Sequence, residues 1–188
     1  MPCAICQLLP PPYDAAVTLA DYRPPRDALV LALKFRGTLA LASWLGRQLA
    51  DAVGAHWRVQ GLACAQPLPL IAPIPLGPRR LAQRGFNQSW EIARAMAARL
   101  AWSADPTLLA RRHDTSAQSG LPLVDRHANI AGAFVVPRAD RVARRHIVLV
   151  DDVMTTGATL AEASATLKRH GAARVTVAVV LRTPAPGE

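Results

Sequence analysis

Two largely apolar runs near the end of the chain, residues 147–150 and 174–181, predict strands that are buried on both faces. A strand with one solvent-exposed face would alternate apolar and polar residues, so these runs indicate the interior of a parallel sheet. Residues 70–75 predict a strand at an edge or an end of the sheet, because their prolines cannot donate ladder hydrogen bonds. Two further short strands are expected at residues 108–110 and 132–136.

Helical spacing of apolar residues separates these strands. Residues 21–53 predict a helical hairpin packed over the sheet, with a glycine between its two halves. Residues 89–100 and 160–168 predict two more helices, and Thr159 with Glu162 forms a capping-box pattern at the start of the second. This order of elements predicts an α/β fold with a mainly parallel sheet flanked by helices.

Two adjacent carboxylates, Asp151 and Asp152, end the first apolar run. They are expected at the carboxyl end of a buried strand, where open α/β sheets bind their ligands. Residues 155–159 (TTGAT) follow as a turn of small residues, in which Gly157 lets a ligand approach successive backbone N–H groups. A helix start after such a turn is an anion site. The stretch therefore suits a phosphorylated sugar, with carboxylates for ribose hydroxyls or Mg²⁺ and a turn for the phosphate.

Other proteins also place carboxylates after an apolar strand. A receiver domain is excluded because too little sequence follows the acidic pair to complete that fold. A P-loop nucleotide hydrolase is excluded because the only lysines, Lys34 and Lys168, lie outside any G-x-x-x-x-G-K-[ST] motif. The remaining alternative is a strand, turn and helix whose Asp and Thr residues are only solvated and capping.

Arginines are concentrated directly before the helix expected at residues 89–100. Arg79, Arg80 and Arg84 lie close to Gly85. Guanidinium groups match phosphate oxygens in bidentate geometry, so these residues are candidates for binding a diphosphate, and the alternative is an ordinary basic loop.

A basic corner ends the first helix of the predicted hairpin. Lys34 and Arg36 flank the aromatic Phe35, and Gly37 follows them. Such a corner either faces an anion or is a solvated helix end, which is the commoner arrangement.

Residues 111–130 have no periodicity, and a segment of this length in a compact domain is typical of a lid over an active site or of disorder. A lid would shield a bound ligand and a reactive intermediate from water. His113 and Asp114 are weak candidates for a general base and its partner. The polar residues able to contact a ligand are His113, Asp114, Gln118, Arg126, His127 and Asn129.

Cys3 and Cys6 form one C-x-x-C pair, which is half of a tetrahedral zinc site. Cys64 and His56 would complete four ligands only with unusual spacing, so an internal Zn²⁺ site is the less favoured interpretation. No thioredoxin-like pattern surrounds the pair, so we expect thiols or metal ligands and no redox motif.

The net charge of +9 favours polyanionic partners such as nucleic acid or a diphosphate substrate. No aromatic residues alternate with basic ones along the chain as in a typical single-strand-binding groove. The longest apolar stretch, residues 62–76, is broken by four prolines, so no membrane span is expected. The first twelve residues lack a signal-peptide pattern, and we expect a cytoplasmic protein.

Residues 147–159 resemble the signature of the type I phosphoribosyltransferases, which bind 5-phosphoribosyl-1-diphosphate (PRPP). The resemblance implies that Asp151 and Asp152 contact the ribose hydroxyls and Mg²⁺. It assigns the 5′-phosphate to the turn residues Thr155, Thr156, Gly157, Ala158 and Thr159.

Across nearly its whole length, the chain is similar to the ComF branch of this family, named for a role in DNA uptake and competence. The similarity rests on residues 33–37, 73–76, 84–88 and 115–121, on Arg126, Asn129 and Phe134, and on the signature. It implies an N-terminal segment (1–20), a helical hood (21–60) and a phosphoribosyltransferase-like core (61–188). It also implies a diphosphate loop at residues 76–88 and a lid at residues 111–130.

The resemblance leaves two functions open. One is a phosphoribosyltransferase that uses Mg²⁺ and an unidentified acceptor. The other is a ligand sensor without catalysis, or an accessory protein that binds single-stranded DNA or competence proteins. Whether the chain pairs into a homodimer is also open.

Members of the ComF family often begin with a zinc finger of more than one C-x-x-C pair, and here only Cys3 and Cys6 are present. Either the finger is lost, or translation starts upstream and a second pair completes a Zn²⁺ site. We expect the second case, and mass spectrometry that finds Met1 or Pro2 at the native N-terminus would contradict it.

Overall fold

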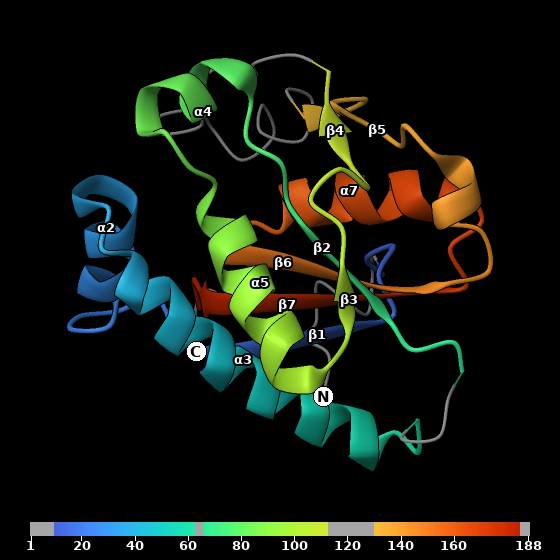
Figure 1. The fold of residues 1–188 in the computed structure, drawn as a ribbon, viewed down its shortest axis with the longest axis horizontal. Coiled ribbons are helices and arrows are strands. Elements are labelled where there is room, and N and C mark those ends of the chain that lie inside the picture. Colours follow the sequence, from blue (N-terminus) through green and yellow to red (C-terminus); the bar gives the residue numbers. More distant parts are fainter. Residues whose placement is uncertain (1–9, 63–65, 113–129, 185–188) are drawn as a thin grey trace.

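A five-stranded parallel sheet forms the centre of the computed structural model, which describes residues 10–62, 66–112 and 130–184 (Figure 1). The sheet combines strands from both ends of the chain. Its strands, in spatial order, are β1 (Ala15–Asp21), β7 (Arg174–Arg182), β6 (His146–Met154), β2 (Leu70–Pro73) and β3 (Ser103–Ala104).

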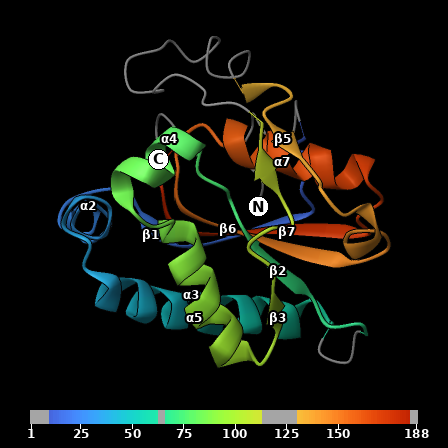
Figure 2. The same ribbon diagram turned by 45° about the horizontal axis from the view of Figure 1, so that its top comes forward.

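Helices cover both faces of this sheet (Figures 1 and 2). One face carries α2 (Asp27–Arg36), α3 (Leu39–Val59) and α5 (Gln88–Leu100), and the other carries α7 (Ala158–Arg169). Successive residues of β6 enter the two cores alternately, which explains why its apolar run is continuous. Ile147 and Leu149 pack on the α7 side, and Val148 and Val150 pack on the α3 and α5 side.

The strands predicted at residues 108–110 and 132–136 do not join the central sheet. They correspond to β4 (Ala110–Arg111) and β5 (Phe134–Val135), which pair with each other in an antiparallel two-stranded sheet. The buried apolar residues of this segment, including Phe134, pack beside α7. Short apolar segments therefore predicted strands correctly but did not identify their sheet.

The elements that were not expected from the sequence include β1, β3 and a helix before α5. Strand β1 runs across residue 20, where the N-terminal segment was expected to end and the helical hood to begin. It pairs with β7 along six residue pairs. It is rich in alanine, has only one buried position and occupies the edge of the sheet, so it lacks the apolar run of a central strand. The basic segment before α5 contains the helix α4 (Pro78–Arg84), which starts with a proline and ends at Gly85 in the left-handed conformation (φ 77°).

Candidate functional site

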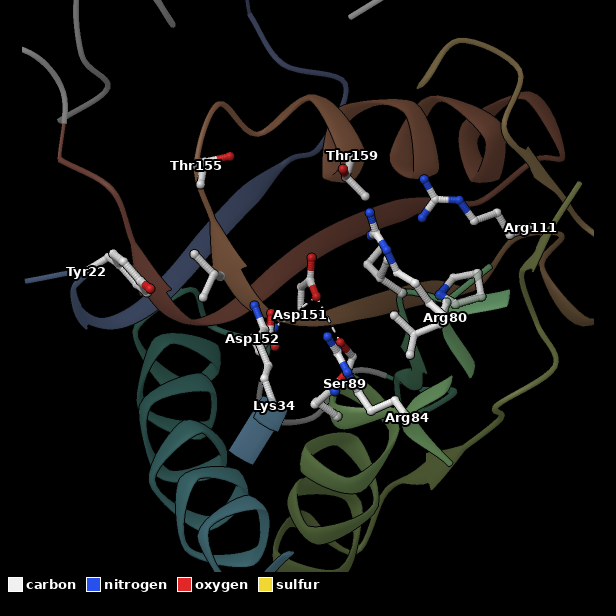
Figure 3. A pocket seen from close by; sticks show the side chains of 15 residues that line it. Tyr22, Lys34, Arg80, Arg84, Ser89, Arg111, Asp151, Asp152, Thr155 and Thr159 are labelled. Atoms are coloured by element: carbon white, nitrogen blue, oxygen red, sulfur yellow. Dashed lines mark hydrogen bonds and ion pairs between the residues drawn. The ribbon is translucent and has the colours of Figure 1, made fainter. Parts of the chain in front are cut away.

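The carboxyl ends of β2 and β6 open into a pocket of about 420 Å³ (Figure 3). The acidic pair, two of the three arginines of α4, the start of α5 and the turn at residues 155–159 all face this pocket. Its polar lining residues are Tyr22, Lys34, Arg80, Arg84, Gln88, Ser89, Arg111, Asp151, Asp152, Thr155 and Thr159.

The acidic pair is held by contacts from two helices and the backbone. Ser89 at the start of α5 donates its hydroxyl to Asp151 Oδ1 at 2.9 Å, and the backbone N–H of Asp152 donates to the same oxygen at 2.9 Å. The ammonium of Lys34 at the end of α2 lies 3.1 Å from Asp152 Oδ2. The corner at Lys34 therefore faces an anion, and that anion is the acidic pair itself.

Burial and, second, the neighbouring Asp152 carboxylate raise the pKa of Asp151 to about 7, although Ser89, Lys34 and the Asp152 backbone N–H oppose the shift. The Lys34 ammonium pairs with one carboxylate of this pair, and the Arg84 guanidinium also interacts electrostatically with Asp152. Carboxylate oxygens are the ligands that Mg²⁺ prefers, and Mg²⁺ usually completes its coordination with water and substrate phosphates. The described residues hold no group of three or more His, Cys, Asp or Glu able to bind a metal. Asp151 and Asp152 therefore suit Mg²⁺ in combination with oxygens of a ligand.

The raised pKa predicts a pH-dependent stability. Because the pKa of Asp151 in the folded protein is above its ordinary value of 3.8, the folded state binds more protons, and the free energy of unfolding falls between about pH 4 and pH 7. The variant Asp151→Asn has no carboxyl group to titrate at this position, so it does not show this loss of stability. We expect the stability of the ligand-free variant relative to the wild type to increase by roughly 1–4 kcal/mol from pH 5 to pH 8. Denaturant unfolding at both pH values measures this, and a difference that is equal at the two pH values would contradict it.

Lys34 is expected to stabilise the ligand-free protein. The side chain of Asp152 is only 9% exposed, so the variant Lys34→Met leaves a nearly buried carboxylate without its cation. We expect the free energy of unfolding to fall by about 1–3 kcal/mol. Arg36→Met, on the same helix but exposed, should change it by less than about 0.5 kcal/mol. Thermal unfolding that gives both variants the same melting temperature would show that the ion pair contributes nothing.

The turn after β6 forms a second, smaller hollow of about 80 Å³, lined by residues 153–160 and by Asp151. Gly157 has a φ of 76°, a conformation that L side chains rarely adopt, and it is the N-cap of α7. The first backbone N–H groups of α7 therefore lie at this turn, where they could bind an anion. The expected capping box is wrong: α7 begins at Ala158, and the carboxylate of Glu162 accepts from the backbone N–H of Gly132 at 3.1 Å instead.

Of the predicted diphosphate ligands, Arg80 and Arg84 line the pocket and Arg79 does not. Arg79 is exposed on α4, and Gly85 ends that helix without lining the pocket. Burial lowers the pKa of Arg84, and Arg80 lowers it further against the opposing effect of Asp152. A bound anion would therefore stabilise the charged forms of these two guanidinium groups.

Asn87 orients the start of α5, which the sequence analysis overlooked. Its side-chain oxygen accepts from the backbone N–H of Ser89 at 3.0 Å, and its amide nitrogen donates to the backbone oxygen of Ile74 at 3.0 Å. An asparagine directly before a helical pattern is an N-cap signal that could have been used. The side chain of Gln88 is buried, and among the described residues its amide nitrogen has no hydrogen-bond partner, so it can donate to a ligand.

Several predicted site residues lie outside the described parts of the chain. They are His113, Asp114, Gln118, Arg126 and Asn129 of the expected lid, and Cys3 and Cys6 of the expected zinc pair. These assignments stay predictions. In the parts of the chain that the structure describes, no helix is long and apolar enough to cross a membrane.

Sequence comparisons give relatives over almost the whole chain. The family profile of the phosphoribosyl transferase domain matches residues 87–188. The DNA utilization protein YhgH of Escherichia coli K12 is 39% identical over 183 residues, which is 97% of this chain and 78% of that protein. Competence protein F of Haemophilus influenzae is 31% identical over 179 residues, which is 93% of this chain and 76% of that protein.

Solved structures with a similar backbone include two hypoxanthine phosphoribosyltransferases. The enzyme from Staphylococcus aureus is 14% identical with a TM-score of 0.45, and the match covers 76% of this chain and 65% of that one. The enzyme from Trypanosoma cruzi is 15% identical with a TM-score of 0.47, and the match covers 75% of this chain and 64% of that one. Both matches span less than two thirds of the other chain.

Proposed function

Because the chain belongs to the phosphoribosyl transferase domain family, in the ComF branch that its sequence resembles, we propose that its pocket binds PRPP together with Mg²⁺. The observation that carries this proposal is the meeting of three kinds of subsite in one place. An acidic pair, a phosphate-binding turn and two arginines lie around the pocket at the carboxyl end of the sheet (Figure 3). PRPP has a ribose, a 5′-phosphate and a diphosphate, one group for each subsite.

Each subsite receives one part of the ligand. Asp151 and Asp152 accept hydrogen bonds from the ribose hydroxyls and contribute carboxylate oxygens to Mg²⁺. The backbone N–H groups of residues 155–159 bind the 5′-phosphate at the start of α7. Arg80 and Arg84 bind the diphosphate.

In the transfer reaction, the bond between ribose C1′ and the diphosphate oxygen breaks, and its electron pair leaves with the diphosphate. An acceptor lone pair then forms the new bond to C1′. Bound Mg²⁺ would supply charge stabilisation to the leaving diphosphate. Arg80 and Arg84 stabilise the same charge, while the acidic pair and the turn hold the ribose in a fixed orientation.

Diphosphate release distinguishes an enzyme from a sensor. The intact protein is incubated with PRPP and Mg²⁺, alone and with a panel of nucleobases, nucleosides and nucleotides, and diphosphate is measured with a coupled assay. Release that depends on one acceptor supports transfer. PRPP binding without release for any acceptor would contradict transfer and support a ligand sensor.

A second candidate function is binding of single-stranded DNA. The E. coli relative is named a DNA utilization protein, and a groove of about 410 Å³ between α3 and α5 favours this function. Arg47, Arg94 and Arg99 line this groove, and Trp44 nearby is 45% exposed. Arg94 and Arg99 also pair with carboxylates of Glu91 and Asp51, which reduces the positive charge available.

An electrostatic complex at this groove must weaken with salt, since each phosphate contact releases counterions. We expect the affinity for a single-stranded oligonucleotide to fall steeply between 50 and 200 mM salt, on the order of tenfold or more for a few phosphate contacts. The variant Arg47→Gln should bind more weakly. Affinity that neither salt nor this variant changes would eliminate the groove as a nucleic-acid site.

A further inference from the structure

A second large hollow, of about 560 Å³, lies directly beside the PRPP pocket. The end of α2 and the helix α4 form its sides, so we call it the α2–α4 hollow. Lys34, Arg80 and Arg84 line both this hollow and the PRPP pocket. A molecule in the hollow would therefore lie next to the ribose and the diphosphate of bound PRPP.

The charge of the α2–α4 hollow selects for an anion. Four basic side chains line it, and none of its lining residues is Asp or Glu. Lys34 already pairs with Asp152, and Arg80 and Arg84 also face the diphosphate subsite. Arg36 lines the hollow without lining the PRPP pocket, so its charge remains for a second anion when PRPP is bound.

The same hollow contains two aromatic rings, those of Phe35 and Phe86. The side chain of Phe35 is 75% exposed, which is unusual for a large apolar residue. The guanidinium carbon of Arg84 lies 5.8 Å from the centroid of the Phe35 ring. An exposed aromatic ring among cations is the combination on which a base stacks while its phosphate is bound.

We propose that the α2–α4 hollow binds the acceptor of the phosphoribosyl group and that this acceptor is a nucleotide, with its base against Phe35 and its phosphate near Arg36. This inference rests on the proposed function, because the acceptor role requires PRPP in the adjoining pocket. A neutral nucleobase would use the ring and leave the charge of Arg36 without an anion. A phosphate-bearing nucleoside uses both.

The transfer to such an acceptor balances without a further reactant. A nitrogen or hydroxyl oxygen of the nucleotide forms the bond to ribose C1′ as the C1′–diphosphate bond breaks. The proton of that nitrogen or oxygen passes to the departing diphosphate, which Arg80 and Arg84 bind. The products are the phosphoribosylated nucleotide and diphosphate.

Calorimetric titration of the intact chain tests this proposal. PRPP with Mg²⁺ is titrated first, and then AMP, dTMP and adenosine are each titrated into the PRPP-saturated protein. We expect both nucleotides to bind and adenosine to bind at least about tenfold more weakly, since it lacks the charge-assisted phosphate contact.

Two variants separate the acceptor site from the PRPP site. Phe35→Leu and Arg36→Gln alter residues that line only the α2–α4 hollow. Each should weaken nucleotide binding by about 5- to 100-fold, from the loss of one stacking contact or one charged hydrogen bond, and leave the PRPP affinity unchanged. Matched controls are Leu31→Ala and Arg26→Gln, exposed residues that line neither cavity, and they should bind nucleotides normally.

The source of the nucleotide follows from a further titration with a 5′-phosphorylated single strand of about ten thymidines. If the single strand binds much more tightly than dTMP, and Phe35→Leu weakens both ligands equally, the acceptor is part of a nucleic acid. If the single strand and dTMP bind with the same affinity, the acceptor is a free nucleotide.

Four results would overturn the proposal. The first is that nucleotides displace PRPP, and the second is that adenosine binds as tightly as AMP. The third is that both variants leave nucleotide binding unchanged. The fourth is that Phe35→Leu changes only the oligomeric state, as expected if Phe35 lay in an apolar protein interface.

If the wild type fails to bind PRPP, the proposed function fails separately. Nucleotide binding that still depends on Phe35 and Arg36 would then identify a nucleotide site and rule out its acceptor role.

Discussion

Replacing Asp151 and Asp152 together by asparagine is expected to abolish PRPP binding in the presence of Mg²⁺. Both carboxylates face the pocket, and each is expected to form charged hydrogen bonds to the ribose or to contribute an oxygen to the metal. Loss of two such contacts, each worth about 1.5–3 kcal/mol, predicts an affinity at least about 100-fold weaker. Calorimetry on the wild type and the double variant measures the change.

The matched control for this experiment removes two exposed carboxylates elsewhere. Asp51 on α3 and Asp140 have side chains that are 56% and 71% exposed and pair with Arg99 and Arg138. The double variant Asp51→Asn, Asp140→Asn changes the net charge by the same amount and should bind PRPP like the wild type. If the Asp151 and Asp152 variant keeps its affinity within about threefold, the acidic pair does not bind the ligand.

Replacing Arg80 and Arg84 together by glutamine is expected to weaken PRPP binding by about 100-fold while leaving ribose 5-phosphate binding within about threefold of the wild type. The reason is the separation of the subsites. The arginines face the pocket from α4, whereas the 5′-phosphate is assigned to the turn at the start of α7. Parallel titrations with the two ligands measure the selectivity.

Arg79→Gln provides the control on the same helix. Arg79 is exposed and does not line the pocket, so this variant should bind PRPP normally. An equal loss from Arg79→Gln would restore the sequence-based assignment of all three arginines to the diphosphate. Equal losses for PRPP and ribose 5-phosphate in the Arg80 and Arg84 variant would contradict the separate diphosphate subsite.

The central strands and the acidic pair could be predicted from the sequence because their surroundings impose a local pattern. A strand covered by helices on both faces needs an apolar side chain at every position, and β6 has a continuous run from Ile147 to Val150. The turn at residues 155–159 was likewise predictable from a short run of small residues that follow one another in the sequence. Strand β1 has no such pattern because it lies at the edge of the sheet, where alanine and threonine suffice.

The contacts that support the acidic pair could not be predicted from local pattern. Ser89 is 62 residues from Asp151 in the sequence, and Lys34 is still farther from Asp152, so each pairing depends on how a helix packs against β6. A capping-box pattern at Thr159 and Glu162 was misleading for the same reason. The Glu162 carboxylate is used by the distant backbone N–H of Gly132 instead of the start of its own helix.

Calorimetric titration of the intact chain with PRPP tests whether the pocket at the carboxyl end of the sheet binds this ligand. The titration is run with Mg²⁺ and again with the metal removed by EDTA. The proposal predicts one binding site per chain, with an affinity that falls when Mg²⁺ is removed. No heat of binding at PRPP concentrations up to about 1 mM, corresponding to less than about 4 kcal/mol of binding free energy, would contradict it.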